Sequence, residues 1–324
     1  MKHKYLFIIS LMILTVFTLC GCGSKKYDTK NQLELGLIED MPVYGSYGMS
    51  MDFAVIADGE NINDATYRKT ASTLLINDST KEVETAYNVH KKIYPASMTK
   101  IMTGLLVIES IDQGKLSMDK VVTLDHTVTF DEWNVMASDL TGGCQVTVKD
   151  LLYSLLIRSY NDCAILLAEQ VAGSESAFVD MMNEKAIELG AVNTHFENPH
   201  GLHSDNHYTT AYDLYIIFSE FIKHDLAYII DSIPLYEFTY IDENGVTQTK
   251  EIKPTNGFLA EECNLPDGYS LGSWKTGTTD QAGNCLMIEF VKDSTGDKFI
   301  AVVAGADGPE ALYSDMTKLI HSAE

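Results

Sequence analysis

The sequence predicts an α/β fold of the α+β type, in which an antiparallel sheet is built from both ends of the chain. Two observations predict it. Short apolar runs typical of strands occur within residues 53–89 and again after residue 234, and apolar residues recur at helical spacing between them. Strands at both ends with helices between favour a sheet assembled from the two termini, with helices packed on it and a mostly helical subdomain inserted. A functional site is expected where sheet and subdomain meet.

The first half of the chain is expected to start with strands and continue with helices. Residues 72–76 (STLLI) and 82–89 flank a polar turn at 77–79, which indicates a hairpin, and a shorter apolar run (FAVIA) precedes it at 53–57. Helices are expected at 98–111, 148–157, 161–172, 175–189 and 211–221.

The second half returns to strands. Residues 234–253 alternate around an Asn244-Gly245 turn signal, and 286–291 and 299–304 flank a second turn, so both segments are expected to be hairpins. An amphipathic helix is expected at 309–320.

The composition is that of a globular protein that does not bind nucleic acid. The 324 residues can bury a sizeable core, and 45% hydrophobic with 21% charged residues argue against disorder. The 46 Asp and Glu against 23 Lys and Arg give a formal charge of −23, which repels phosphate backbones. DNA and RNA are therefore excluded as partners.

The N-terminus is typical of an exported bacterial lipoprotein. Lys2 and Lys4 precede an apolar run at 5–19, which is shorter than the roughly 20 residues that span a bilayer. The run ends in LCGC at 19–22, which resembles a lipobox with Cys22 as the lipid-modified first residue. An uncleaved anchor helix is the alternative. Loss of Lys2 and Lys4 lowers the formal charge to −25.

These features divide the chain into three parts. We expect a signal peptide at 1–21, a lipidated N-terminus and polar tether at 22–50, and one large domain at 51–324 whose helical subdomain covers about 97–235. The protein would then be extracytoplasmic, lipid-anchored to the outer face of the bacterial cytoplasmic membrane. Four further cysteines match no paired zinc motif, and either free thiols or disulfides are compatible with them: Cys144, Cys163, Cys263 and Cys285.

A first candidate catalytic motif opens the helix after Pro95. Residues three apart share a helix face, so the Lys100 amine can reach the Ser97 hydroxyl, and Ser97 lies among the unpaired N–H groups of the first turn. Ser117 and Lys120 have the same spacing but lie in a polar stretch. Ser97 and Lys100 are therefore the preferred nucleophile and base.

Two other polar triplets occur where a buried or extended chain is expected. Ser159-Tyr160-Asn161 separates two apolar helices, whereas the similar Ser204-Asp205-Asn206 lies in a polar loop. Lys275-Thr276-Gly277 lies in a strand-like segment. On an edge strand it would offer a charge, a hydroxyl and close backbone approach to a ligand.

Together these motifs resemble the signature of the penicillin-recognising serine enzymes. Their surroundings are similar to the D-alanyl-D-alanine carboxypeptidases, the low-molecular-mass penicillin-binding proteins of the S11 peptidase family. The similar stretches are YPASMTK at 94–100, SYND at 159–162, NPHGL at 198–202, KTGTT at 275–279 and AGNCL at 282–286. The resemblance implies a β-lactamase/transpeptidase-like fold. It also implies removal of the terminal D-alanine from peptidoglycan stem peptides through an acyl-enzyme, without metal or organic cofactor, and inhibition by β-lactams.

The resemblance also implies a role for each matching residue. Ser97 is the expected nucleophile, Lys100 its proton acceptor and Ser159 the proton shuttle to the leaving amine. The expected substrate-binding residues are Asn161, which orients Lys100 and the substrate amide, Lys275 and Thr276, which hold the terminal carboxylate, Gly277, and Thr278, whose N–H forms an oxyanion hole with that of Ser97.

The proposed base needs a perturbed environment. A lysine amine, with an ordinary pKa near 10.4, is a poor base at neutral pH unless burial or a neighbouring cation removes its proton. Lys275 can be that cation. It would also attract a carboxylate that the negative protein repels as a whole.

The sequence leaves several alternatives open. A β-lactamase of class A would need a Glu-x-x-Leu-Asn segment between the second and third motifs, which the chain lacks, and a related DD-endopeptidase would share the fold. A zinc hydrolase would use the histidines at 195–207, whose spacing fits no His-Glu-x-x-His helix. A catalytically silent binding lipoprotein is the last alternative.

The domain organisation expected here differs from that of many S11 enzymes, which carry a second, strand-rich domain and a C-terminal amphipathic anchor. No C-terminal β-rich domain is expected here, and the N-terminal lipid would replace the anchor. The preference for pentapeptide or cross-linked substrates, the stage of the cell's life at which the protein acts and the oligomeric state stay open.

Overall fold

The computed structural model describes residues 53–67, 69–132 and 135–323. The expected signal peptide, the lipidation site Cys22 and the tether up to residue 50 lie outside the described residues. The described part belongs to one compact unit. The expected boundaries at 21, 50 and 97–235 stay predictions.

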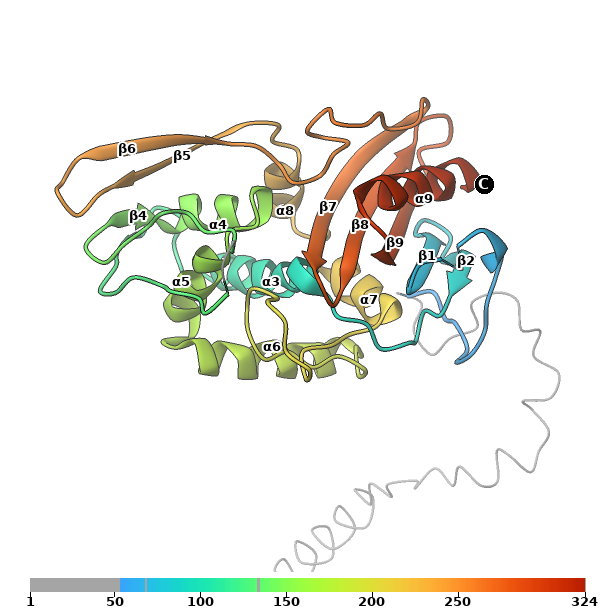
Figure 1. The fold of residues 1–324 in the computed structure, drawn as a ribbon, viewed down its shortest axis with the longest axis horizontal. Helices are drawn as coiled ribbons and strands as arrows, with labels where there is room; N and C mark the ends of the chain where they lie inside the picture. The colour runs from blue at the N-terminus through green and yellow to red at the C-terminus, as the bar shows by residue number, and fades with distance from the viewer. Residues whose placement is uncertain (1–52, 68, 133–134, 324) are drawn as a thin grey trace, which may run out of the picture. The chain divides into compact units, whose positions relative to one another are not determined.

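A five-stranded antiparallel sheet joins the two ends of the described chain (Figure 1). Its strand order is β2-β1-β9-β8-β7. The strands are β1 (Ser72–Asn77), β2 (Glu82–Tyr87), β7 (Tyr269–Thr279), β8 (Gly283–Lys292) and β9 (Lys298–Ala306). Ser72 pairs with Ala304 and Asn77 with Phe299, so the N-terminal hairpin is bonded directly to a C-terminal strand. The predicted sheet from both termini is confirmed.

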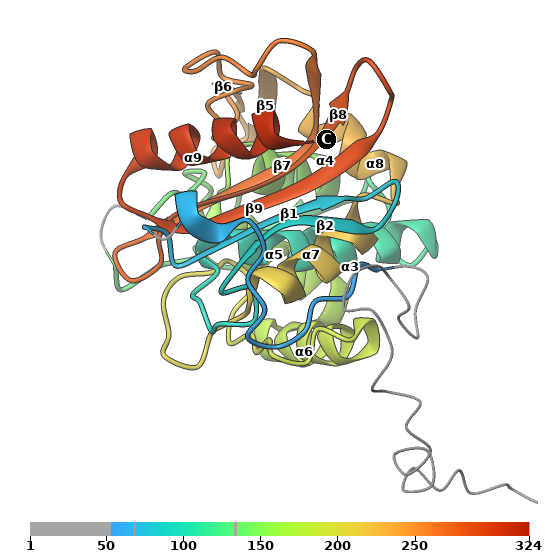
Figure 2. The same ribbon diagram turned by 90° about the vertical axis from the view of Figure 1, so that its right-hand side faces the viewer.

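The sheet is covered on both faces (Figure 2). All six residues of β1 are buried, because successive side chains point to opposite faces and both faces carry helices. Leu74 and Ile76 pack in the cluster that includes the helices of the subdomain, whereas Leu75 packs in the cluster that includes α9 (Pro309–Ser322). The sheet is therefore the middle layer of three.

The helices of the subdomain match the sequence periodicity closely. They are α3 (Lys100–Asp112), α4 (Val148–Ile157), α5 (Asn161–Ala172), α6 (Glu175–Leu189), α7 (Ala211–Phe221) and α8 (Asp225–Asp231). Thr147, Ser174 and Thr210 cap α4, α6 and α7 by accepting a backbone N–H. Only α8, seven residues long, was not predicted. Ten of the 13 residues of α3 are buried, so this helix lies at the centre of the unit.

The start of α3 differs from the prediction. Residues 96–99 form a 3-10 helix, η2 (Ala96–Thr99), and the α-helix begins at Lys100. Ala96 has a φ of 48°, which breaks the regular helix before Ser97. The nucleophile candidate therefore lies in a tight turn that leads into the central helix.

A second sheet was not predicted as such. Its order is β3-β4-β5-β6, formed by β3 (Val121–Thr123), β4 (Gln145–Thr147), β5 (Tyr236–Ile241) and β6 (Thr247–Ile252). The hairpin at 234–253 was expected, but its strand β5 pairs with β4, which in turn pairs with β3. At three residues each, β3 and β4 are too short to give a sequence period. The apolar run at 53–57 forms no strand, and a short 3-10 helix, η1 (Asp64–Thr66), follows it.

The four cysteines of the described part, which the sequence left open, form no disulfide. Cys144, Cys163, Cys263 and Cys285 are free thiols. Among the described residues, no helix combines the length and apolar character needed to cross a bilayer.

Candidate active site

A cavity of about 880 Å³ lies where the sheet meets the helical subdomain. It is lined by η2, the turn between α4 and α5, and the edge strand β7. Ser97, Ser159 and Asn161 line it from the helical side, and Thr276 and Thr278 line it from the sheet. The structure thus brings the three sequence motifs together in one cleft.

Ser97 and Lys100 are in hydrogen-bond contact at the base of the cleft. Lys100 Nζ lies 2.9 Å from Ser97 Oγ, and it donates to Asn161 Oδ1 at 2.7 Å and to the carbonyl of His200 at 2.6 Å. The Lys100 side chain is fully buried, whereas Ser97 is half-buried and faces the cavity. A nucleophile open to a ligand is therefore bonded to an amine that solvent does not reach.

The environment of Lys100 favours its neutral form. Burial is the largest cause and the positive charge of Lys275 the next, and both hold the pKa of Lys100 well below its ordinary value of 10.5. A neutral amine can accept a proton from a hydroxyl at 2.9 Å. Lys100 therefore has both the position and the charge state of a general base.

The turn between α4 and α5 directs Ser159 into the cleft. Ser159 has a φ of 65°, a left-handed conformation that is rare for a residue with a Cβ. Its Oγ accepts a hydrogen bond from Lys275 Nζ at 3.1 Å. Two residues on, Asn161 fixes the opposite wall, because its N–H and its Nδ2 both donate to the carbonyl of Met136, at 2.9 and 3.1 Å.

Lys275 points inward from the edge strand. It is fully buried, and its Nζ donates to Ser159 Oγ and, at 3.2 Å, to the carbonyl of Thr276. Burial lowers the pKa of Lys275 to about 7, an effect that the Asp231 carboxylate partly offsets. The neighbouring Thr276 hydroxyl lies 2.5 Å from the Thr255 hydroxyl at the cavity wall.

Gly277 allows β7 to pass directly against the Ser97 turn. A Cβ at this position would lie 2.9 Å from the carbonyl oxygen of Pro95 and 3.1 Å from the backbone nitrogen of Ser97. Only glycine permits this approach. It brings the backbone before Thr278 next to the N–H of Ser97, where two donors could face one ligand oxygen.

Comparisons with known proteins agree with this arrangement. The family model for D-alanyl-D-alanine carboxypeptidase, Peptidase_S11, matches residues 60–308. The chain belongs to the S11 peptidase family.

D-alanyl-D-alanine carboxypeptidase DacF of Bacillus subtilis is 35% identical over 268 residues, which cover 82% of this chain and 64% of DacF. The chain thus spans less than two thirds of that relative. A variant of the Streptomyces K15 DD-transpeptidase has a TM-score of 0.69 at 27% identity, with 78% of this chain and 97% of that chain covered. Penicillin-binding protein D2 of Listeria monocytogenes, solved with cefotaxime bound, has a TM-score of 0.65 at 26% identity, and the match covers 78% of this chain and 96% of that chain. The predicted β-lactamase/transpeptidase-like fold is confirmed.

The two similar triplets outside the cleft have local structural roles in this S11 chain. Ser117 Oγ accepts the N–H of Asp119 at 3.3 Å, as in a turn, and Ser204 Oγ bonds to Glu197. Neither serine lines the cleft. The preference for Ser97 and Ser159 is therefore supported by position.

The histidines at 195–207 do not converge on a metal site among the described residues. Burial, with Lys100 and His207 nearby, lowers the pKa of His200 to about 3, and burial lowers that of His207 to about 4. His207 Nδ1 accepts the N–H of Glu197 at 3.0 Å, so its Nε2 carries the proton and donates to Thr99 Oγ1 at 2.8 Å. His207 thus holds the loop against η2.

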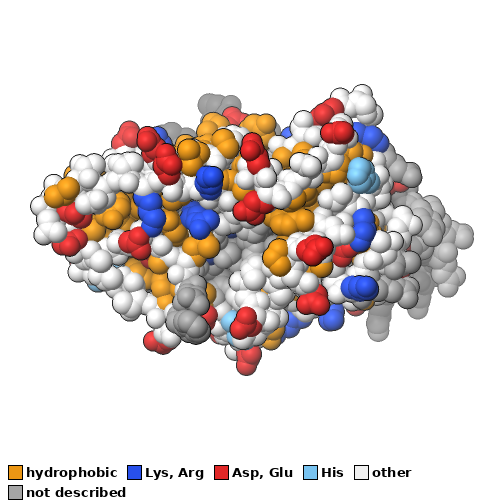
Figure 3. All heavy atoms as spheres, turned by 45° about the horizontal axis from the view of Figure 1, so that its top comes forward, with side chains coloured by type: hydrophobic (Ala, Val, Ile, Leu, Met, Phe, Trp, Pro, Cys, Tyr) orange, Lys and Arg blue, Asp and Glu red, His pale blue; other side chains and the backbone are white. Residues whose placement is uncertain are grey.

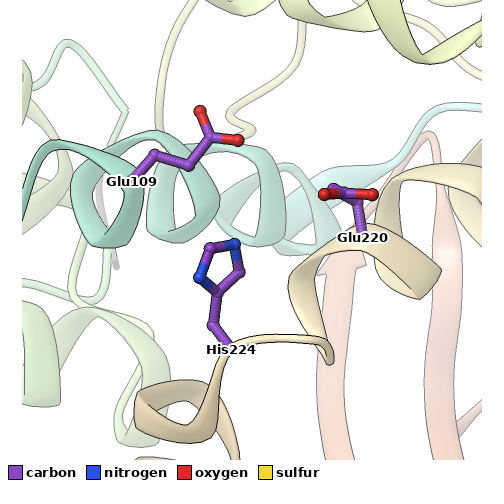
Figure 4. A group of neighbouring side chains, drawn as sticks. All are labelled: Glu109, Glu220 and His224. Carbon is purple, nitrogen blue, oxygen red and sulfur yellow. The ribbon is translucent and has the colours of Figure 1, made fainter. Parts of the chain in front are cut away.

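The described residues contain one group spaced closely enough to hold a metal ion (Figure 4). It consists of Glu109, Glu220 and His224. Lys185 Nζ lies 2.7 Å from Glu109 Oε1 and Lys223 Nζ lies 2.8 Å from Glu220 Oε2, so both carboxylates already have a cation. Glu109 is near the C-terminal end of α3, whereas Lys100 opens that helix, which separates this group from the cleft.

The structure adds residues to this S11 site that the sequence analysis did not single out for it. Asp231 is buried behind β7, where it accepts the N–H of Trp274 at 3.3 Å, and burial raises its pKa to about 7. Gly201, with a φ of 89°, packs so closely that a Cβ would lie 1.9 Å from the carbonyl oxygen of Ala96. The NPHGL stretch was a usable signal for Gly201. No signal in the sequence pointed to Asp231 or Thr255, because their importance depends on contacts that are made only in the fold.

Proposed function

We propose that the protein is a serine-type D-Ala-D-Ala carboxypeptidase that removes the terminal D-alanine of peptidoglycan stem peptides. The observation that carries this proposal is the contact of 2.9 Å between the Ser97 hydroxyl and a fully buried lysine amine. The names of the relatives and the shared fold support the same activity. β-Lactams would be covalent inhibitors, as the cefotaxime complex of the Listeria protein suggests.

The geometry suggests how each side chain would act in acylation. Ser97 Oγ attacks the carbonyl carbon of the penultimate D-alanine while Lys100 takes its proton. The N–H groups of Ser97 and Thr278 stabilise the oxyanion. Ser159, bonded to Lys275 Nζ at 3.1 Å, passes a proton to the leaving nitrogen. Lys275 and Thr276 hold the carboxylate of the leaving D-alanine, and water then hydrolyses the ester.

The proposal also includes a location for the protein, which depends on the signal and lipidation motif at its N-terminus. A signal at 1–21 and a lipid on Cys22 would export the chain and hold it at the outer face of the bacterial cytoplasmic membrane, beside its peptidoglycan substrate. Replacing Cys22 by alanine should release the protein from membranes while leaving its activity intact.

The activity is tested with a synthetic peptide that ends in D-Ala-D-Ala. We expect release of D-alanine by the wild type, loss of at least 1000-fold in Ser97→Ala, and unchanged release in the matched control Ser117→Ala. A fluorescent penicillin should label the wild type and the control but not Ser97→Ala. Labelling that survives in Ser97→Ala would refute the nucleophile, and sustained nitrocefin hydrolysis would favour a β-lactamase instead.

A further inference from the structure

The loop of residues 135–140 forms part of the wall of the catalytic cleft. Its residues adopt neither helix nor strand, and Asp139 has a φ of 74°, which is uncommon for a residue with a Cβ. Val135 and Met136 line the cleft, which is visible as the hollow near the centre of Figure 3. Because the loop lacks regular secondary structure, its shape depends on hydrogen bonds to neighbouring elements.

Two neighbouring residues at the start of α5 hold this loop at two points. The N–H and the Nδ2 of Asn161 donate to the carbonyl of Met136, at 2.9 and 3.1 Å. Next in the chain, the Asp162 carboxylate accepts the N–H of Ser138, at 3.1 and 3.0 Å from its two oxygens, and also the Ser138 hydroxyl. Ser138 Oγ in turn accepts the N–H of Leu140 at 3.3 Å. Asp162 thus anchors the loop two residues after the Met136 carbonyl.

The Asp162 carboxylate is a buried titratable group that the proposed reaction does not use. Asp162 is 3% exposed and Ser138 is fully buried. A carboxylate is costly to bury unless hydrogen bonds or charges compensate it, and Ser138 supplies two donors. Burial first and Lys275 next lower the pKa of Lys100, whereas the Asp162 charge raises it. A favourable effect of Asp162 on the base must therefore come from position and not from charge.

The Met136 carbonyl determines which way the amide of Asn161 points. An Asn side chain can turn by about 180°, which exchanges the places of its oxygen and its nitrogen. With Nδ2 bonded to the Met136 carbonyl, the amide oxygen faces Lys100 Nζ at 2.7 Å. The opposite orientation would place two carbonyl oxygens against each other. It is therefore disfavoured as long as the Met136 carbonyl stays in place.

This orientation leaves the base free to act. A neutral lysine amine has two N–H donors and one lone pair. Two carbonyl oxygens lie within hydrogen-bond distance of Lys100 Nζ, Asn161 Oδ1 at 2.7 Å and His200 O at 2.6 Å, and they take the two donors. The lone pair then remains for the Ser97 hydroxyl at 2.9 Å. A turned Asn161 amide would instead donate to this lone pair, so that Lys100 could not take the proton.

We infer that Asp162 is a positioning residue for acylation, which acts through Ser138 on the carbonyl of Met136. The inference rests on the proposed function, because it concerns the base of that reaction. Asp162 holds the loop, the loop fixes the Asn161 amide, and the amide keeps the lone pair of Lys100 directed at the nucleophile. Loss of this anchor should slow acylation without removing any group that touches the substrate.

A purely structural role for Asp162 is the alternative that the test must separate. Asp162 lies in the first turn of α5, where a carboxylate stabilises a helix. Asp150 has the same place in α4, is buried as well and accepts the hydroxyls of Thr147 and Tyr236, but it does not line the cleft. Asp150→Ala is therefore the matched control for the loss of a buried carboxylate.

The test is a double-mutant cycle on the second-order rate of labelling by a fluorescent penicillin. Asp162→Ala should slow labelling about tenfold in the otherwise wild-type protein, but less than about twofold in the Asn161→Ala background, where no amide is left to position. Asp150→Ala should label within about twofold of the wild type at a temperature where it is folded. Ser138→Ala removes only a hydroxyl, so it should show the pattern of Asp162→Ala with a smaller loss. It takes the place of Asp162→Ala if that variant does not fold.

A second measurement follows the amide itself. The NMR signal of the Asn161 side-chain amide, assigned by its absence from Asn161→Ala, should shift in Asp162→Ala and stay in place in Asp150→Ala. An equal slowing of labelling in both backgrounds, or an unmoved amide signal in Asp162→Ala, would overturn the inference. The proposed function can fail separately: a wild type that is labelled but releases no D-alanine is not a carboxypeptidase, and the cycle still tests the inference. If the wild type is not labelled, the amide signal alone decides.

Discussion

Gly277→Ala is a sharp test of the close packing between β7 and the Ser97 turn. The added Cβ would lie 2.9 Å from Pro95 O, 3.1 Å from Ala96 Cβ and 3.1 Å from Ser97 N. An ordinary carbon–oxygen contact is about 3.3 Å, so strand and turn must separate by about 0.4 Å. All of the nearest atoms belong to the short segment 95–97, so the movement falls on the nucleophile and the oxyanion donors.

Such a displacement should lower the stability of the fold and slow acylation. We expect a loss of about 1 to 3 kcal/mol in the free energy of unfolding, as for other overpacked sites. Acylation should slow by about 5- to 10-fold, since misplacement by 1 Å can cost about 100-fold and the displacement here is about 0.4 Å. The assay is the second-order rate of labelling by a fluorescent penicillin, with thermal unfolding measured in parallel.

The matched control is Gly142→Ala. Its Cβ would meet nothing closer than 3.4 Å, an ordinary contact, and Gly142 does not line the cleft. It should label at the wild-type rate. If Gly277→Ala acylates within twofold of the wild type, the packing argument for Gly277 and for the Thr278 oxyanion donor is wrong.

Three other predictions concern charge and stability. The kcat/KM for acylation should be bell-shaped in pH, because Lys100 must be neutral, with its pKa well below 10.5, while Lys275 must be protonated, with a pKa of about 7. Asp231→Asn removes the charge that raises the pKa of Lys275, so the descending limb should move to lower pH; an unmoved limb would exclude Asp231 as a positioning residue. Thr147→Ala removes the N-cap of α4, where Thr147 Oγ1 accepts the N–H of Asp150, and should lower the free energy of unfolding by about 1 kcal/mol with penicillin labelling retained. If Thr147→Ala loses penicillin labelling at a temperature where it is still folded, the prediction that the cap affects stability but not the active site is wrong.

The sequence predicted most of the fold because its long elements carry strong periods. Helices α4 to α7 have the bounds that the spacing of their apolar residues indicated, and polar caps such as Thr147 and Ser174 mark where α4 and α6 begin. The segment around Ser97 was less predictable. Its 3-10 turn depends on the backbone of Ala96 and on packing against Gly201 and Gly277, which lie far away in the chain.

The sequence by itself determined which residue types the site could use. Local spacing placed Lys100 three residues after Ser97, and the order of the three polar motifs, which resembles that of the penicillin-recognising serine enzymes, suggested an acyl-transfer site. Only the tertiary structure decided the charge states and the neighbours. The low pKa of Lys100 depends on burial and on Lys275, 175 positions away. Such properties arise from solvent exclusion and distance in space, which a linear pattern does not contain.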